Sequence, residues 1–190
     1  MSSKGEKNLV TEPIKAVNAT IELSDTLSID GYMMPNGEFR AGIAGASILL
    51  GYAKNWFNRL RSEAPNKLKA LEDGGFTGYV QPVVVKRESG ARGASRAQTI
   101  SLKDLTTLIT VEALAGNKRA IALQAAFTLE GLDSRFRDAF GVQQRTPEEK
   151  RRFFGLTYEE FLEALAENRA ELEGLRLPGD DLYYPEGDEE

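Results

Sequence analysis

Apolar and polar residues alternate over residues 19–29, and this period of two predicts a β-strand that is interrupted near Ser24. The turn-forming sequences Asp30-Gly31 and Pro35-Asn36-Gly37 flank the short apolar stretch that follows. We therefore expect a hairpin that returns through residues 38–40.

A second hairpin is predicted further along the chain. Residues 79–85 are rich in β-forming side chains, although Pro82 favours an edge strand or a bulge. Residues 97–102 have the composition of a returning strand. The segment between them, residues 87–96, contains three arginines among small residues, so we expect a flexible basic tip.

Apolar residues spaced three or four apart predict several helices. Ser101 and Asp104 resemble a capping box at the start of one of them, and Gly116 terminates it. The helix after Gly116 is apolar on most sides, so we expect it to be buried. The predicted helices cover residues 43–51, 53–62, 66–72, 102–115 and 118–129, and the apolar spacing continues through Leu132, Phe136 and Phe140 to Gly141.

Two further helix starts are predicted near the C-terminal end. Thr146 and Thr157 each precede acidic residues of a first helical turn, and Pro147 suits the first helical position. The helix over residues 157–175 places one apolar stripe on a single face, formed by Tyr158, Phe161, Leu162, Leu165, Leu172 and Leu175. This stripe must be buried either on the domain or on a second copy, and in the second case the protein is a homo-oligomer that forms through this helix.

These elements predict an α+β fold, in which a small antiparallel hairpin sheet packs against helices and an α-helical C-terminal extension and acidic tail follow. We expect a flexible arm over residues 1–18 and a folded domain over residues 19–141. A helical extension over residues 142–178 and a disordered acidic tail over residues 179–190 complete the chain.

The composition narrows the chemistry that is available to the protein. The 190 residues include no His and no Cys, which excludes Ser-His-Asp catalysis, thiol nucleophiles, disulfides and imidazole metal sites. The glycine-rich stretches 42–45 and 90–93 lack the spacing of nucleotide-binding loops, so no cofactor is expected. No apolar run approaches the ~20 residues of a membrane span and no signal-peptide pattern opens the chain, so we expect a cytoplasmic protein without a membrane partner.

The net charge of −5 hides a strong segregation of charge along the chain. Residues 40–103 carry 11 basic and 4 acidic groups, which gives +7. Residues 157–190 carry 2 basic and 12 acidic groups, which gives −10. A basic segment of this kind is typical of a nucleic-acid surface, even in a protein that is acidic overall.

The basic helix over residues 53–62 and the basic loop after residue 86 are the best candidates for binding DNA. Several cations on one surface bind phosphates, and the amides of Asn55 and Asn58 could contact adenine edges in a major groove. Trp56 could stack on a base, but its position on the apolar face favours core packing. The expected contact set for duplex DNA is Lys54, Asn55, Asn58, Arg59, Arg61, Lys67, Lys69, Arg87, Arg92 and Arg96.

Two other functions stay open at this point. The basic and acidic segments could pair between subunits, which would make the protein an interaction or assembly module. A Mg²⁺-dependent nuclease could work with carboxylates and a lysine alone, and the loosely suitable clusters are Glu72-Asp73 and Lys86-Arg87-Glu88.

The order of the predicted elements resembles a known family. A hairpin, the sequence GEFRAGIAGASILLGY over residues 37–52 and a basic segment are similar to the opening of the Bro-N and KilA-N type domains of phage antirepressors and viral DNA-binding proteins. Residues 99–105 and 118–129 are similar to the second half of those domains. The chain departs from the family at Glu38-Phe39, where Trp-Phe is usual, and the segment between the halves is longer and more basic.

The resemblance implies DNA binding, with the C-terminal helices serving oligomerisation or regulation. Together with the basic segment it predicts a non-enzymatic DNA-binding protein, a phage or mobile-element regulator similar to an antirepressor.

Overall fold

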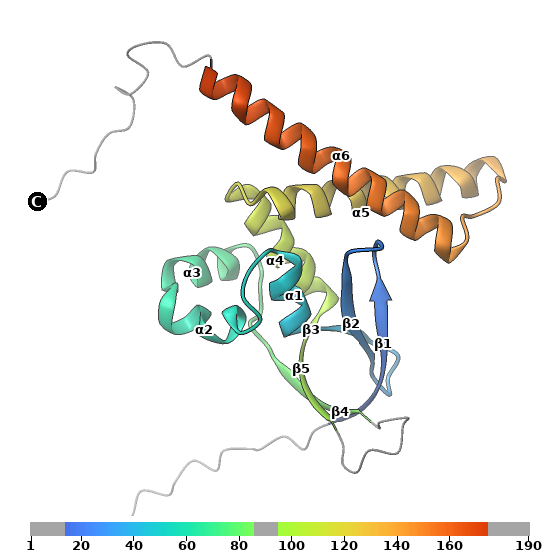
Figure 1. Ribbon diagram of the computed structural model, residues 1–190. Coiled ribbons are helices and arrows are strands. Elements are labelled where there is room, and N and C mark those ends of the chain that lie inside the picture. Colours follow the sequence, from blue (N-terminus) through green and yellow to red (C-terminus); the bar gives the residue numbers. More distant parts are fainter. Residues whose placement is uncertain (1–13, 86–94, 175–190) are drawn as a thin grey trace, which may run out of the picture.

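The computed structural model describes residues 14–85 and 95–174, which form an α+β fold (Figure 1). The strands are β1 (Ile14–Glu22), β2 (Ser28–Met33), β3 (Phe39–Gly42), β4 (Gln81–Val85) and β5 (Ser95–Ser101). The helices are α1 (Ile43–Leu49), α2 (Trp56–Glu63), α3 (Pro65–Asp73), α4 (Leu102–Leu114), α5 (Lys118–Phe140) and α6 (Pro147–Gly174). Most of the predicted arm, most of the basic tip and all of the predicted acidic tail lie outside the described residues.

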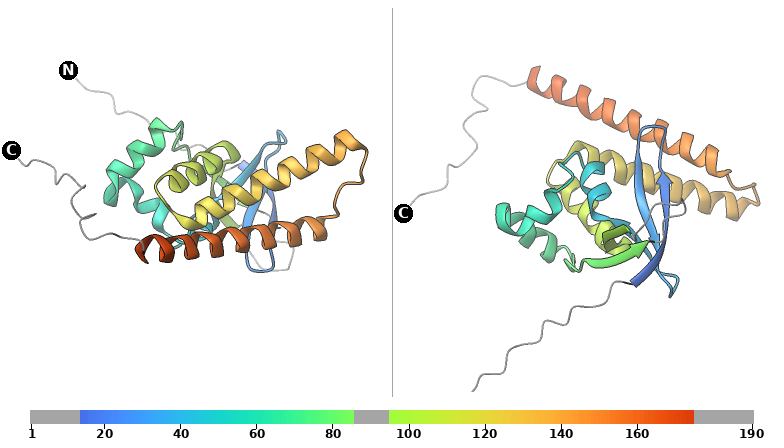
Figure 2. Two further views of the ribbon diagram at one scale, coloured as in Figure 1. Left: turned by 90° about the horizontal axis from the view of Figure 1, so that it is seen from above. Right: turned by 60° about the horizontal axis from the view of Figure 1, so that its bottom comes forward.

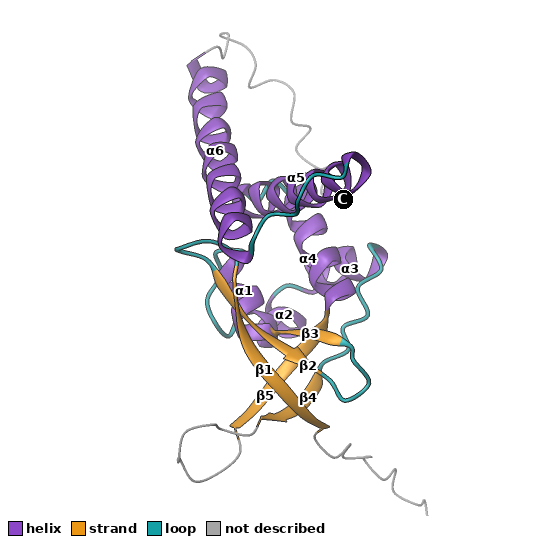
Figure 3. Ribbon diagram, turned by 90° about the vertical axis from the view of Figure 1, so that its right-hand side faces the viewer, coloured by secondary structure: helices purple, strands orange, loops and turns teal. Residues whose placement is uncertain are grey.

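The strands form a closed barrel rather than the small hairpin sheet that the sequence pattern predicts (Figure 3). β1, β2 and β3 are successive antiparallel neighbours, and β5 pairs antiparallel with both β3 and β4. β4 closes the barrel through a short parallel pairing with β1, in which Ile14 lies opposite Val83. Residues 19–29 were expected to form one interrupted strand, but they belong to two strands, β1 and β2, that pair antiparallel. The pairing of β1 with β4 joins segments that are far apart in the sequence, so it depends on the whole chain.

The strand boundaries correct two details of the prediction. β1 begins at Ile14, so the last residues of the expected arm belong to the sheet. Asp30-Gly31 is not a turn, because Gly31 lies inside β2 opposite Ala19 and Ala41. A Cβ atom at position 31 would lie 2.8 Å from Cγ1 of Ile21, so glycine lets Ile21 lie across this strand. The hairpin turn at residues 35–37 is confirmed, with Gly37 at a φ of 84°.

Two apolar cores hold the fold together. A small core fills the barrel and consists of Ala16, Tyr32, Met34, Val83 and Val85. The main core lies between the barrel and the helices, and it includes Ile100 from β5, Phe57 from α2 and Leu123 from α5. Phe154 and Tyr158 from α6 belong to the same core, so the predicted C-terminal extension packs directly on the domain.

The helix caps that the sequence predicts are confirmed where they depend on local residues. Ser101 Oγ accepts the backbone N–H of Asp104 at 3.0 Å at the start of α4. Gly141 ends α5 at a φ of 64°, as predicted. The N-cap of α5 is Asn117, a role that the sequence analysis did not assign to it. The expected helix start at Thr157 is wrong, because α6 is continuous and the buried Thr157 hydroxyl donates to the carbonyl of Phe153.

Candidate nucleic-acid interface

The α2 helix presents two chemically different faces. Phe57 and Leu60 are buried in the main core and fix the helix to the domain. Lys54 and Asn55, which precede the helix, are exposed, as are Asn58 and Arg59 within it. The apolar side therefore holds a polar, partly basic surface outward, as the spacing predicts.

Asn55 occupies the N-cap position of α2, but its side chain makes no capping hydrogen bond. The Arg59 guanidinium forms an ion pair with Glu63 at 3.4 Å, one helical turn away. Both side chains are about half exposed, and a pair of this kind exchanges readily with solvent or with another anion. The Arg59 cation is thus available to a phosphate.

Lys67, another member of the predicted contact set, is partly buried and paired with an acid. Its Nζ atom lies 2.8 Å from Oε1 of Glu112, a carboxylate that is 1% exposed, and it donates to the Tyr52 hydroxyl at 2.7 Å. The Tyr52 hydroxyl in turn donates to Glu112 Oε2 at 2.5 Å. Glu112 Oε1 has no hydrogen bond from any other described residue, so the lysine is its counterion.

The protonation of Lys67 follows from these contacts. Burial acts to lower its pKa, but the hydrogen bonds to Glu112 and Tyr52 and the charge of Glu112 outweigh burial and raise the pKa above its ordinary value. Lys67 is therefore charged at neutral pH and neutralises Glu112. It contributes little free positive charge to the surface.

Trp56 packs against the main core and is half-buried, consistent with the core-packing interpretation. Its ring stacks on Tyr52 with a centroid distance of 4.2 Å and an interplanar angle of 12°. Lys67 Nζ lies 5.4 Å from the Trp56 ring centroid and 4.8 Å from that of Tyr52. One face of the indole is thus already occupied by an aromatic neighbour.

The other predicted contact residues are dispersed. Lys69 is exposed on α3, and Arg96 is exposed on β5 opposite Val84. Arg87 and Arg92 lie outside the described residues, as does the side chain of Arg61. The structure therefore brings Lys54, Asn55, Asn58 and Arg59 together around the first half of α2.

Arg40 was counted as part of the basic segment, but it is buried. Its guanidinium forms an ion pair with Glu38 at 2.6 Å, and its Nε donates to Thr99 Oγ1 at 3.0 Å. Arg40 and Lys67 are thus both neutralised by acids that lie outside residues 40–103. The surface of this segment is less basic than its sequence indicates.

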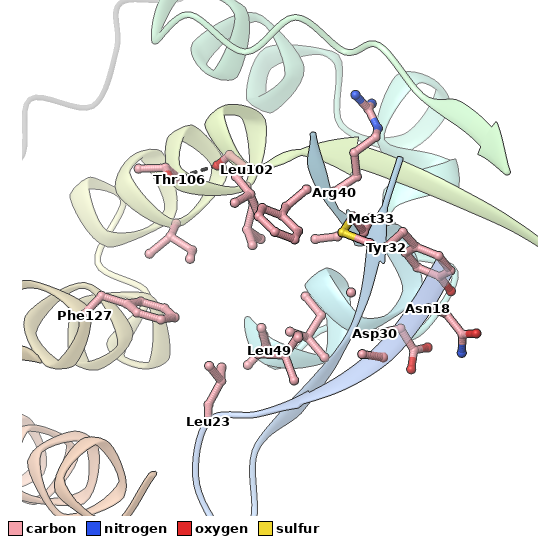
Figure 4. Close-up of a pocket in the computed structure, with 18 of the residues that line it drawn as sticks. Asn18, Leu23, Asp30, Tyr32, Met33, Arg40, Leu49, Leu102, Thr106 and Phe127 are labelled. Carbon is pink, nitrogen blue, oxygen red and sulfur yellow. Dashed lines mark hydrogen bonds between the residues drawn. The ribbon is translucent and has the colours of Figure 1, made fainter. Parts of the chain in front are cut away.

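An apolar groove of about 740 Å³ lies between the β1–β3 side of the barrel and helices α4 and α5 (Figure 4). Its exposed apolar side chains include Val17, Ile21, Met33, Phe39, Leu102 and Phe127. The guanidinium of Arg40 points away from the groove (Figure 4). Burial and the charge of Asp30 raise the pKa of Tyr32 in the groove wall, so this phenol is neutral at pH 7.

The sequence analysis did not anticipate this groove. Alternation along β1 puts Val17, Ala19 and Ile21 on one face of the strand, and this face lines the groove. The helices leave part of this face open, because α5 crosses it at only one end (Figure 2).

No three Asp or Glu side chains within residues 14–85 and 95–174 gather as a group that could hold a metal ion. Glu72 and Asp73 of the nuclease hypothesis lie within the described residues, whereas Lys86, Arg87 and Glu88 all lie outside them. The same part of the chain contains no helix long and apolar enough to cross a membrane.

Comparisons of the chain with known protein families, curated proteins and solved structures find no match.

Proposed function

We propose that this protein binds duplex DNA without catalysing a reaction, and that it acts as a phage-type or mobile-element regulator similar to an antirepressor. The observation that carries the proposal is the outer face of α2, where Lys54, Asn55, Asn58 and Arg59 are exposed together. The likeness of residues 37–52, 99–105 and 118–129 to Bro-N and KilA-N type domains supports the same function.

The proposed interface combines two kinds of contact. Lys54 and Arg59 neutralise phosphates, which releases counterions and makes the affinity depend on salt. Asn55 and Asn58 offer amide groups that can hydrogen-bond to adenine in a major groove. Phe57 and Leu60 fix the helix from behind, so it meets DNA as a rigid element. Lys69 and Arg96 extend the phosphate contacts from neighbouring elements.

The test compares two double variants that lose the same charge at different places. Lys54→Gln/Arg59→Gln removes two proposed contacts, whereas Lys15→Gln/Lys103→Gln removes two exposed cations from β1 and α4. Duplex affinity is measured by fluorescence anisotropy over a series of salt concentrations. We expect the first variant to bind more weakly, with a salt slope reduced by about 0.9 per lost contact, and the second to resemble the wild type.

Equal losses in the two variants would show that binding follows net charge and not the α2 face. Absence of salt-dependent binding in the wild type would overturn the proposal as a whole. Nicking of the same duplex in Mg²⁺ would overturn its non-enzymatic part and favour the nuclease hypothesis.

A further inference from the structure

The α5 helix buries only one of its sides. Ala120, Ala122, Leu123 and Ala126 are fully buried against the domain. The opposite side carries an apolar series with spacings of three and four residues, which keeps its members on one face. We call this series the outer stripe; it consists of Ile121, Ala125, Leu129, Leu132, Phe136 and Phe140.

The two ends of the outer stripe have different shapes. A shallow hollow of about 440 Å³ lies over its first part, and Ile121, Ala125 and Leu129 help to line it. Phe136 and Phe140 protrude at the other end, where they are 62% and 76% exposed. One end therefore offers a cavity and the other end offers large apolar side chains.

The protruding end is accessible to another molecule. The last part of α5 extends beyond the barrel, with the start of α6 beside it (Figures 1 and 2). α2 and α3 lie on the far side of the domain from this end in the same views. This end of the outer stripe therefore lies away from the proposed DNA surface.

We propose that the partner on the outer stripe is a second copy of this chain, packed with its own α5 in the antiparallel direction. With Leu129 opposite Leu132 of the second copy, the same register places Phe136 opposite Ala125 and Phe140 opposite Ile121. Each protruding phenylalanine then enters the hollow of the other copy. Two-fold symmetry repeats every contact, as an isologous interface requires.

The antiparallel direction follows from the shape of the stripe. A parallel pair would set Phe136 against its own equivalent and leave both hollows empty. Voids and crowded aromatic side chains both cost free energy, whereas large side chains opposite small ones pack at close distance. The outer stripe is thus complementary to itself only when it is reversed.

The exposed area is sufficient for a modest dimer. An aromatic side chain buries about 150–250 Å², so the exposed parts of Leu129, Leu132, Phe136 and Phe140 amount to about 450 Å² per copy. Together with the residues beside the stripe, two copies bury about 1,000 Å², which is the lower limit for a specific interface. An interface of this size is expected to be weak and reversible.

The first experiment measures the oligomeric state of the full chain by sedimentation velocity, over a concentration series through the micromolar range and without DNA. We expect a monomer–dimer equilibrium in the wild type. Phe136→Glu/Phe140→Glu should raise the dissociation constant roughly a hundredfold or more, because four buried phenylalanines are replaced by charges. Circular dichroism checks that this variant is folded.

The matched control is Phe39→Glu, which changes a phenylalanine of the apolar groove that is 59% exposed. It should dimerise like the wild type. A dimer lost in Phe39→Glu and retained in Phe136→Glu/Phe140→Glu would assign the interface to the groove and overturn the proposal. A wild type that stays monomeric throughout the series would also overturn it.

The second experiment tests the register, and it uses the absence of native cysteine. An equimolar mixture of Ala125→Cys and Phe136→Cys is oxidised and examined for covalent dimers. In the proposed register the two introduced thiols face each other. Phe136 of the Ala125→Cys copy still packs against Ala125 of the Phe136→Cys copy, so half of the paired contacts are kept. Equivalent positions on the two copies would be about 16 Å apart along the helix axis, too far for a disulfide.

We expect covalent dimers in the mixture and almost none in either variant alone. Cross-linking of Phe136→Cys alone would indicate a parallel pair and overturn the antiparallel register. Neither experiment contains DNA, so a result that overturns the proposed dimer does not bear on the proposed DNA binding.

Discussion

The two ends of α5 carry equally apolar side chains in very different surroundings. Leu123, in the first half, is fully buried in the main core. Phe136, near the other end, is mostly exposed and stacks loosely on Phe140 at a centroid distance of 6.4 Å. Helical spacing identifies apolar positions at both ends, but burial depends on what the rest of the fold places beside them.

The largest expected effect comes from the buried end. Leu123→Ala should lower the free energy of unfolding by about 3 kcal/mol, because it removes core contacts and leaves a cavity. Phe136→Ala should change it by less than about 0.5 kcal/mol at concentrations where the protein is monomeric. Urea unfolding of dilute protein measures both. Similar losses in the two variants would show that the outer end of α5 is packed in the monomer.

Ion pairs show a related contrast between the domain and its outer end. The Lys67–Glu112 pair lies within the domain, where the carboxylate has no access to water. At the outer end of α5, Asp133 accepts hydrogen bonds from Arg137 at 2.8 Å and from Arg145 at 2.9 Å, and all three side chains are about a quarter exposed. Removal of one partner should therefore be more damaging in the domain.

Lys67→Met should lower the free energy of unfolding by about 2 kcal/mol, because it leaves the buried Glu112 without a counterion. This is below the 3–5 kcal/mol typical of a fully buried pair, since 29% of the Lys67 side chain is exposed. Arg59→Met is the control, and the loss of its exposed pair should cost less than about 0.5 kcal/mol.

The double variant Lys67→Met/Glu112→Gln separates charge from packing. It should regain part of the lost stability, because the uncompensated charge is absent. If the double variant is less stable than Lys67→Met, the ion pair is not the reason for the loss.

The smallest expected effect is at Asp133 and depends on pH. The hydrogen bonds from Arg145 and Arg137 lower the pKa of Asp133 below its ordinary value. A carboxyl group with a lowered folded-state pKa stabilises the fold above its unfolded pKa, and this contribution is lost as the pH falls through the folded-state pKa. Asp133→Asn should therefore melt below the wild type at pH 7, and the difference should shrink as the pH falls below about 3.9.

Thermal melts of wild type and variant across this pH range measure the difference. Asp138→Asn serves as the control, because Asp138 accepts a hydrogen bond from the neutral amide of Gln144. A difference for Asp133→Asn that is constant with pH would mean that the two arginines do not act through its charge.

The net charge counted along a segment of sequence differs from the charge that the segment exposes on the folded surface. Counting residues 40–103 gives +7, yet Arg40 and Lys67 are paired with Glu38 and Glu112 from outside that segment. Such pairs join residues that only the folded chain brings together. The exposure of Asn58 and Arg59 on α2 was predicted correctly, because amphipathic spacing within one helix is a local property. Lys54 and Asn55 are exposed too, but they precede the helix, which begins at Trp56 and not at residue 53 as predicted.

The sequence by itself determined the features that depend on neighbouring residues. The turn at residues 35–37, the cap at Ser101 and the end of α5 at Gly141 all follow from short-range sterics and hydrogen bonding.

Only the tertiary structure decided the features that depend on distant segments. These are the parallel closure of the barrel by β1 and β4, the pairing of Lys67 with Glu112, the continuity of α6 through Thr157 and the exposure of the outer stripe. Each results from the packing of segments that are far apart in the sequence, where loop closure, shape and burial act together. A local pattern can identify an apolar or charged residue, but it does not contain the position of the group that will cover or neutralise it.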